Sequence, residues 1–303
     1  MRVFVTGASG WIGSAVVPEL LSAGHEVLGL ARSDRSADTV TALGAQVHRG
    51  SLDDVASLRA GAEQADGVVH LGYHHDFSEM AEAARLDRQA IDAMGDVLAG
   101  TDGPLIVAAG VLGVGDGRVA TEDDRPDPSV HPRVANAAFA QGLADRGVRS
   151  CVVRFAPTVH GHGDHGFVAT LVDLARRSGF AGYVDDGANR WPAVHRADAA
   201  TLVRLAVEGA PAGSALHAVA EEGVPARTIA EAIGRSLGVP ARSVAADAAA
   251  EHFGWIGGFF AMDSAASNAL TRERLGWSPT HPGIVEDIDA GAYADVEPHS
   301  TAS

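Results

Sequence analysis

The sequence predicts an α/β protein with a doubly wound parallel sheet and a smaller, mainly helical C-terminal cap. Through the first half of the 303 residues, apolar segments of strand length alternate with segments of helical periodicity. The strand-like segments are apolar on both faces, which is typical of parallel strands buried between two helical layers. A turn with three glycines follows the first of these segments.

The predicted elements follow one another regularly. Strands are expected at residues 2–5, 25–31, 45–50, 65–72, 104–110 and 149–155. Helices are expected between them, at residues 11–24, 36–44, 53–64, 75–100 and 133–147. Residues 157–195 are rich in glycine and histidine and predict a loop with one short helix. The later segments predict helices at 167–179, 198–210 and 228–238, with a further sheet strand at 214–220.

The composition excludes several classes of partner. A net charge of −16 provides no basic field to attract nucleic acid or an anionic membrane surface. The sequence has no apolar run of about 18 residues, so no membrane span is expected. No signal-peptide segment precedes the first strand, and the single cysteine, Cys151, cannot form an intrachain disulfide. These features predict a cytoplasmic protein whose partner is a small molecule.

The glycine turn predicts a dinucleotide-binding loop. Gly7 permits the tight turn, Gly10 lets the backbone approach a pyrophosphate, and Gly13 lets the following helix pack on the sheet. The helix N-terminus offers N–H groups and a positive dipole end to the phosphates. The cofactor contacts expected here come from Gly7, Ser9, Gly10, Trp11, Ile12 and Gly13.

The end of the second strand predicts which dinucleotide binds. Ala31 stands where an acidic residue would select NAD by accepting the ribose hydroxyls. Arg32 and Ser33 follow, and both can donate hydrogen bonds to the 2′-phosphate of NADP. The alternatives are that Arg32 is merely solvated and that the nearby Asp34 weakens phosphate binding. We expect NADP(H) rather than NAD(H).

Four stretches together resemble one enzyme family. They are TGASGWIG at 6–13, DGVVHLG at 66–72, VVRFAPTVHGHGDHG at 152–166 and YVDDGANRWPAVHRADAA at 183–200, followed by TRERLGWSPT at 271–280. The chain is similar to the extended and atypical short-chain dehydrogenases/reductases, close to the NAD-dependent epimerase/dehydratase group. The resemblance implies a Rossmann-type dinucleotide-binding domain at 1–157, rejoined by 196–220. It also implies a substrate-binding cap from 158–195 and 221–303, and a homodimer as one possible assembly.

The resemblance also implies further cofactor contacts. Leu71 and Gly72 would pass under a cofactor ribose. Ser51 and Leu52 would border the adenine, although the family usually has an acidic residue at the position of Ser51. The nicotinamide end would be bordered by Ala108, Ala109, Gly110, Pro157, Thr158 and Val159.

The sequence departs from the family in its catalytic residues. Such enzymes use a tyrosine acid/base, a lysine four residues later, and a serine or threonine after the fifth strand. All 23 basic residues here are arginines, and the only tyrosines are Tyr73, Tyr183 and Tyr293. The serine position lies in VAAGVLG, and the tyrosine–lysine position reads DPSVHPRVAN. The usual mechanism is therefore excluded, and another group must supply the proton.

Three places are candidate proton donors. Tyr73 follows the fourth strand, and His75 beside Asp76 comes next, although both of the latter residues can instead cap the following helix. His131 and Arg133 lie near the missing tyrosine–lysine pair, where Arg133 can hold a ribose or substrate but is a poor acid. His160 is the third candidate.

The histidine-rich segment raises the question of a metal. His160, His162 and His165 with Asp164 have the chemistry of ligands, but their spacing matches no standard zinc pattern, so no metal is expected. The residues expected to shape the substrate pocket, or else to have structural roles, are His74, His162, Trp191, His195 and Phe259.

Three functions are consistent with these features. The first is an NADPH-dependent reductase of a small carbonyl or imine compound with an atypical proton donor. The second is an NAD(P)-dependent epimerase or dehydratase of a sugar-like substrate, which the missing tyrosine–lysine pair disfavours. The third is an NAD(P)-binding sensor without catalytic activity. We expect the first.

Overall fold

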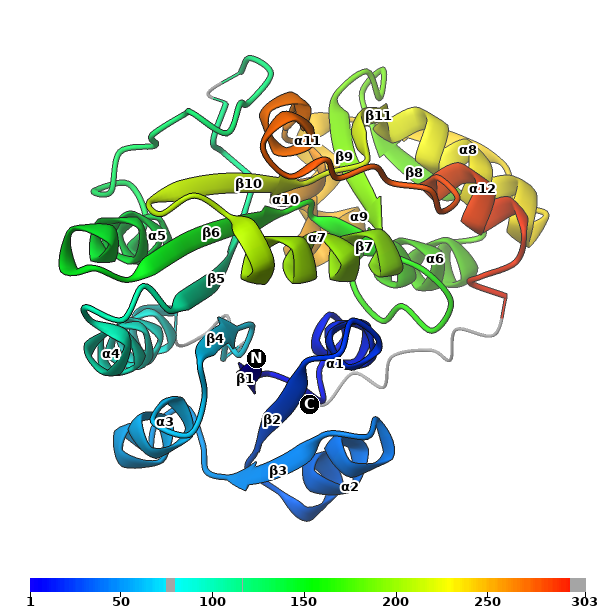
Figure 1. Ribbon diagram of the computed structural model, residues 1–303. Helices are drawn as coiled ribbons and strands as arrows, with labels where there is room; N and C mark the ends of the chain where they lie inside the picture. Colours follow the sequence, from blue (N-terminus) through cyan, green and yellow to red (C-terminus); the bar gives the residue numbers. More distant parts are fainter. Residues whose placement is uncertain (75–79, 116, 295–303) are drawn as a thin grey trace.

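The computed structural model describes residues 1–74, 80–115 and 117–294 and confirms the predicted fold class. A seven-stranded sheet has the order β10-β6-β5-β4-β1-β2-β3 (Figure 1), and every neighbouring pair of its strands is parallel. Its strands are β1 (Arg2–Thr6), β2 (Glu26–Ala31), β3 (Gln46–Arg49), β4 (Gly67–His70), β5 (Pro104–Gly110), β6 (Arg149–Phe155) and β10 (Ser214–Ala218).

Helices cover both faces of this sheet (Figure 1). One layer is formed by α1 (Gly13–Ser22), α2 (Asp34–Ala42) and α7 (Arg196–Gly209). The opposite layer is formed by α3 (Val55–Ala62), α4 (Met80–Leu98) and α5 (Pro132–Gly142). Val3 and Val5 of β1 face the first layer, whereas Phe4 between them faces the second. Apolar residues on both faces of the strands therefore produce the two buried layers, as the sequence predicted.

The C-terminal part forms a second hydrophobic core that includes Trp191, Phe253, Phe260 and Tyr293. Its helices are α6 (Phe167–Ser178), α8 (Ala226–Leu237), α9 (Ala249–Phe253), α10 (Gly257–Phe260) and α12 (Ile284–Asp289), whereas α11 (Ala269–Leu275) packs against α7 and β10 of the main sheet. It also holds five short strands, β7 (Thr158–His160), β8 (Ala181–Val184), β9 (Arg190–His195), β11 (Glu221–Pro225) and β12 (Ala241–Val244). They form two small sheets, β11-β9-β7 and β12-β8.

The predicted loop at 157–195 was therefore wrong in part, because β7, β8 and β9 lie within it. The strands are only three to six residues long, and β9 contains Pro192. A proline inside an apolar segment argues against a strand in sequence analysis. The pairing with β7 and β11 stabilises β9 in spite of that residue.

The order of the strands reverses beside the glycine turn. From β1 the chain continues to β2 and β3 on one side, whereas β4, β5 and β6 lie on the other. In doubly wound sheets the ligand binds at this reversal, outside the carboxyl ends of the strands. Here those ends belong to β1 and β4, which pair from Val3↔Gly67 to Thr6↔His70.

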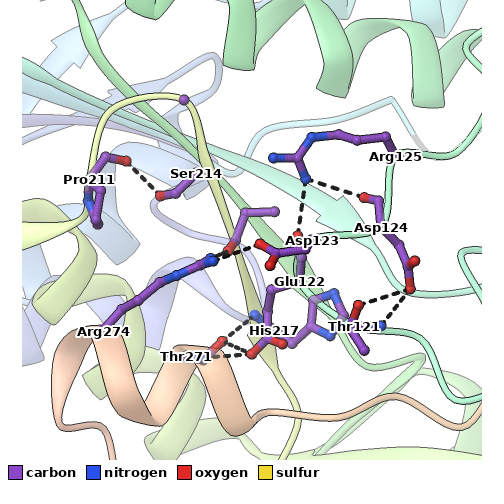
Figure 2. A network of polar contacts seen from close by, with 12 residues as sticks. Thr121, Glu122, Asp123, Asp124, Arg125, Pro211, Ser214, His217, Thr271 and Arg274 are labelled. Atoms are coloured by element: carbon purple, nitrogen blue, oxygen red, sulfur yellow. Dashed lines mark hydrogen bonds and ion pairs between the residues drawn. The ribbon is translucent and has the colours of Figure 1, made fainter.

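A buried polar network lies at the carboxyl ends of β6 and β10 (Figure 2). Glu122 is fully buried, and one of its carboxylate oxygens accepts hydrogen bonds from the backbone N–H and the hydroxyl of Thr271, both at 2.6 Å. The Thr271 hydroxyl oxygen accepts the His217 N–H at 2.8 Å. Arg154 donates to the backbone oxygen of Asp124 at 2.9 Å. These contacts hold residues 121–125 and α11 against the ends of β6 and β10.

Within the described residues, no helix combines the length and apolar character required to cross a membrane.

Candidate functional site

At two positions of the glycine turn, Gly7 and Gly13, the structure leaves no room for a side chain. Gly7 has φ +68°, and a Cβ there would lie 2.8 Å from the Gly72 nitrogen. A Cβ on Gly13 would lie 2.0 Å from the Gly7 oxygen. The turn is closed by a hydrogen bond from the Gly10 N–H to that oxygen at 2.9 Å. The first and third glycines therefore allow β1, β4 and α1 to approach closely.

The middle of the turn fits a diphosphate. A Cβ on Gly10 would have only the Gly7 oxygen, at 3.2 Å, within 4 Å, so the other side of Gly10 is open in the described structure. Ile12, the residue that precedes α1, provides no side-chain cap for the helix. The first N–H groups of α1 are therefore suited to bind an anion, with Ser9 at the rim of the turn.

Trp11 connects the turn to a segment far along the chain. Its indole N–H donates to the Val159 oxygen at 2.7 Å. The Arg196 guanidinium lies 4.1 Å from the centre of the indole ring and donates to the Ser14 hydroxyl at 2.7 Å. The predicted cofactor segment Pro157, Thr158 and Val159 thus meets the glycine turn. Thr158 is buried, and its hydroxyl has no partner among the described residues.

The end of β2 presents an exposed cation. Arg32 is exposed, and no hydrogen bond or ion pair to a described residue holds its guanidinium. Ser33 forms a capping box with Ser36 at the start of α2, so its hydroxyl is already used in capping. Asp34, which weakened the NADP prediction, has its carboxylate 2.6 Å from an Arg49 nitrogen. Much of the negative charge at this position is therefore compensated.

The predicted adenine contacts lie at the neighbouring strand ends. Leu52 is half-buried, and a Cβ on Gly72 would lie 3.0 Å from a Leu52 methyl. Ser51 hydrogen-bonds to the carboxylate of Asp53 and, with a backbone hydrogen bond, lowers the pKa of that group. Leu71 donates its N–H to the Thr6 oxygen at 3.3 Å. The sequence prediction did not include Asp53.

The end of β5 lies between β4 and β6, where the nicotinamide end was predicted. Ala108 and Ala109 are half-buried and Gly110 is exposed. A Cβ on Gly110 would have no described atom within 4 Å. The end of β5 thus consists of small residues, and the space around Gly110 is open to a ligand.

Tyr73 lies at this edge against an arginine. The Arg133 guanidinium, from the first turn of α5, is 4.0 Å from the centre of the Tyr73 ring. Burial raises the pKa of the Tyr73 phenol, and the charge of Asp87 raises it further, whereas Arg133 opposes both effects. The phenol therefore stays protonated near neutral pH. Tyr183 and Tyr293 belong to the C-terminal core, so Tyr73 is the one tyrosine at the strand ends.

A buried series of hydrogen-bonded side chains, which the sequence analysis did not predict, extends from Thr6 to Asn136. The Thr6 hydroxyl is 2.7 Å from Nδ1 of His70, and Nε2 of His70 is 3.2 Å from an Asp87 carboxylate oxygen. Asn136 donates to the other Asp87 oxygen at 2.7 Å. Burial opposes the ionisation of Asp87, but His70, Asn136 and Arg133 outweigh it and lower the pKa of its carboxyl. The series thus links the glycine turn to α5.

The other predicted donors have different surroundings. His75 lies outside the described residues, with Asp76. His131 is exposed and caps α5, accepting the Arg133 N–H at 3.1 Å. His160 is fully buried, with Nδ1 2.6 Å from an Asp287 oxygen. The described hydrogen-bond partner of the His131 ring is thus the start of α5, and that of the His160 ring is Asp287 on α12.

The predicted pocket residues do not gather in one place. Trp191 is 1% exposed and packs against Phe167 and Phe260 in the C-terminal core. Phe259 lies near Phe167 as well. His195 caps α7 and stacks on His281 at 4.7 Å.

The remaining predicted pocket residues are also separate. His162 is exposed, and His74 borders a hollow of about 530 Å³ with Asp53 and Arg85. Among the described residues, no group of three or more His, Cys, Asp or Glu side chains is arranged to hold a metal ion.

Comparison with known proteins identifies the family. The model of the NAD dependent epimerase/dehydratase family matches residues 3–218. The chain belongs to this family. Nicotinamide dinucleotides are its typical cofactor, and the open diphosphate turn described above fits one.

Individual relatives are more diverse. An uncharacterized protein of Schizosaccharomyces pombe is 46% identical over 296 residues, which cover 97% of this chain and 100% of the relative. A 3-diazoavenalumate denitrifying reductase of a Streptomyces species is 28% identical, covering 93% of this chain and 97% of the relative. The fold is similar to a dTDP-glucose 4,6-dehydratase from Streptomyces venezuelae, with a TM-score of 0.72, 20% identity and coverage of 96% and 97% of the two chains.

Proposed function

We propose that the protein is an NADPH-dependent reductase of a small carbonyl or imine compound, in which Tyr73 faces the acceptor. The observation that carries this proposal is the contact of Tyr73 with Arg133 at the carboxyl ends of β4 and β5. This is the side of the strand reversal where a nicotinamide ring would lie if the diphosphate occupied the glycine turn. The Streptomyces relative is named a reductase of a diazo compound, and that name supports reduction as the kind of reaction without indicating a carbonyl or imine acceptor.

The protonated phenol suits the reduction of a carbonyl group. When bound, the cofactor supplies a hydride to the acceptor carbon. Tyr73 donates its proton to the oxygen on which negative charge develops, and a C–OH product forms. Arg133 limits the energetic cost of the resulting phenolate, because its fixed positive charge lies over the ring. The phenol regains its proton from solvent, so no lysine is required in the cycle.

Reduction of a protonated imine does not require a proton from Tyr73. A protonated imine already carries the proton on its nitrogen, so hydride addition to carbon gives a neutral amine directly. Tyr73 then only orients the acceptor. This difference allows the two acceptor classes to be separated by one substitution.

Arg32 supports the choice of NADPH. Its guanidinium is exposed at the end of β2, without a described partner, and Arg49 compensates the nearby Asp34. A 2′-phosphate placed there would receive charge-assisted hydrogen bonds from Arg32. Ser33 was also predicted to bind this phosphate. Its backbone N–H donates to the Ser36 hydroxyl oxygen at 3.0 Å, so it can bind a phosphate only if that capping hydrogen bond breaks.

The test is a panel of ketones, cyclic imines and enones, with NADPH oxidation followed by absorbance. We expect turnover with at least one carbonyl or imine and slower turnover in Tyr73→Phe. If NADPH binds but no acceptor is reduced, the protein is a nucleotide sensor and the proposal is wrong.

A further inference from the structure

The guanidinium of Arg133 has N–H groups that the described part of the protein does not use. Arg133 is half-buried, and its Nε is shielded from solvent and has no hydrogen-bond partner. No carboxylate within residues 1–74, 80–115 and 117–294 forms an ion pair with this side chain. A buried N–H group of a cation is unfavourable without a hydrogen-bond acceptor, so a ligand that supplies one gains affinity at this position.

Asp87 is the carboxylate whose charge acts on Arg133, but other groups hold its two oxygens. Nε2 of His70 lies 3.2 Å from one oxygen, and Asn136 donates to the other at 2.7 Å. All three of these side chains are buried. Arg133 lowers the pKa of Asp87 through its charge and not through a hydrogen bond. The buried carboxylate therefore leaves the N–H groups of Arg133 available.

The contact with Tyr73 also leaves these N–H groups available. The carbon of the guanidinium lies 4.0 Å from the centre of the Tyr73 ring. A contact between a cation and an aromatic ring requires no oxygen acceptor, and a guanidinium has five N–H groups. Arg133 can thus remain on the ring while it binds a ligand beside Tyr73.

The surroundings of Arg133 favour an anion. Arg133 lies in the first turn of α5, which contains no acidic residue, and the first N–H groups of a helix carry partial positive charge. The residue before α5, His131, caps the helix with a ring nitrogen and contributes no negative charge. A single guanidinium matches a carboxylate, because two parallel N–H groups can donate to its two oxygens.

We propose that the compound reduced by this protein carries a carboxylate, which Arg133 binds while the carbonyl or imine group lies against Tyr73. The substrate is then an oxo acid or an imino acid. This inference rests on the proposed function and narrows its range of substrates. Since Arg133 contacts Tyr73 directly, both groups of the substrate are bound at one place, the carboxyl ends of β4 and β5.

The test compares 2-oxo-, 3-oxo- and 4-oxopentanoate with their methyl esters. Each pair differs in charge alone at the carboxyl group, and the series varies the distance between that group and the carbonyl. Calorimetry measures binding to the protein saturated with NADP⁺, which has no hydride to transfer, so turnover does not interfere. We expect at least one acid to bind about tenfold more tightly than its ester. Arg133→Met should abolish this preference, and Arg133→Lys, which keeps the charge but not the paired N–H groups, should retain about a threefold preference.

Arg242→Met is the matched control. The Arg242 guanidinium also lies over an aromatic ring, 5.4 Å from the centre of Phe180, but in the C-terminal part of the chain. This variant should keep the preference for the acid. The affinity of Arg133→Met for NADP⁺ should equal that of the wild type, which shows that the fold is intact.

The outcomes separate this inference from the proposed function. Equal affinities of the wild type for acid and ester throughout the series would overturn the carboxylate site, even if ketones are reduced. A preference that survives in Arg133→Met would overturn it as well. If Arg133 selects an acid but no carbonyl or imine compound oxidises NADPH, the proposed reductase is wrong, and the bound carboxylate is not that of a substrate.

Discussion

The replacement Arg32→Ala tests the choice of cofactor most sharply. The guanidinium is exposed, so its contact with a 2′-phosphate dianion is partly screened by water. Hydrogen bonds to charged groups contribute about 1.5–3 kcal/mol, and screening places the expected loss near the middle of that range, at about 2 kcal/mol. This corresponds to an increase of about 30-fold in the dissociation constant of NADP⁺. The dissociation constant of NAD⁺, which lacks the phosphate, should change less than about twofold.

Isothermal titration of both nucleotides measures this difference directly. Arg35→Ala is the matched control, because it removes an equally exposed arginine three residues later, in the first turn of α2. Its effect should be limited to the loss of general positive charge, which raised salt suppresses. Equal losses of NADP⁺ and NAD⁺ affinity in Arg32→Ala would refute the phosphate contact, as would an effect of Arg35→Ala as large as that of Arg32→Ala.

Three further predictions address the proton donor, the buried network and the cysteine. Tyr73→Phe should lower kcat for a ketone about 100-fold and kcat for a protonated imine less than about threefold, while the affinity for NADPH stays unchanged. An equal loss of kcat for the two substrates would contradict a proton-donor role of Tyr73. Burial lowers the pKa of His217 to about 4 in the folded protein, whereas the pKa of a histidine in the unfolded chain is about 6.5. As the pH falls below about 6.5, the unfolded chain therefore binds one proton more than the folded protein, and the free energy of unfolding falls. Urea unfolding should therefore lose about 2 kcal/mol between about pH 7.5 and pH 5, and His217→Gln should reduce this loss; an unchanged pH slope would contradict the assignment. Burial raises the pKa of Cys151 to about 12, so iodoacetamide should modify it only after unfolding in urea, whereas rapid labelling of the folded protein would show that the thiol is accessible.

The His217 prediction follows from the tautomer that the network imposes. Nδ1 lies 2.8 Å from the Ser267 oxygen and must donate its proton to it, since a carbonyl oxygen only accepts. Nε2 lies 3.4 Å from an Arg154 nitrogen, which only donates. A second proton on the ring would face a guanidinium in a buried site. The neutral form is thus the one that the folded protein accommodates.

The main sheet could be predicted because its determinants are local. Each strand is a short apolar segment between helical segments, and the glycine turn marks the strand after which the order of the sheet reverses. The family assignment followed from the same stretches, and the match over residues 3–218 confirms it. Helix ends were less accurate: α1 begins at Gly13 rather than residue 11.

The interior of the candidate site could not be predicted in the same way. Asp87 and Asn136 lie 49 positions apart in the sequence and meet only because α4 packs on α5. A carboxylate in the middle of a helix is usually solvated, so nothing local indicated that Asp87 is buried. Trp191 was expected either to shape the substrate pocket or to have a structural role, and it lies in the C-terminal core. The loop that carries His75 is outside the described residues, so that prediction stays open to experiment.

Titration of NADPH into the wild type and Gly10→Ala tests the central claim, that backbone N–H groups of the first turn bind the diphosphate. Gly10 lies outside the left-handed region, and its added methyl would meet the Gly7 oxygen at 3.2 Å, a tight contact that a shift of the turn by a few tenths of an ångström relieves. The methyl would occupy the space of the diphosphate. We expect one nucleotide per wild-type chain and an affinity at least about tenfold lower in Gly10→Ala, with a similar melting temperature. Absence of binding by the wild type, or equal affinity of the two proteins, would contradict the account.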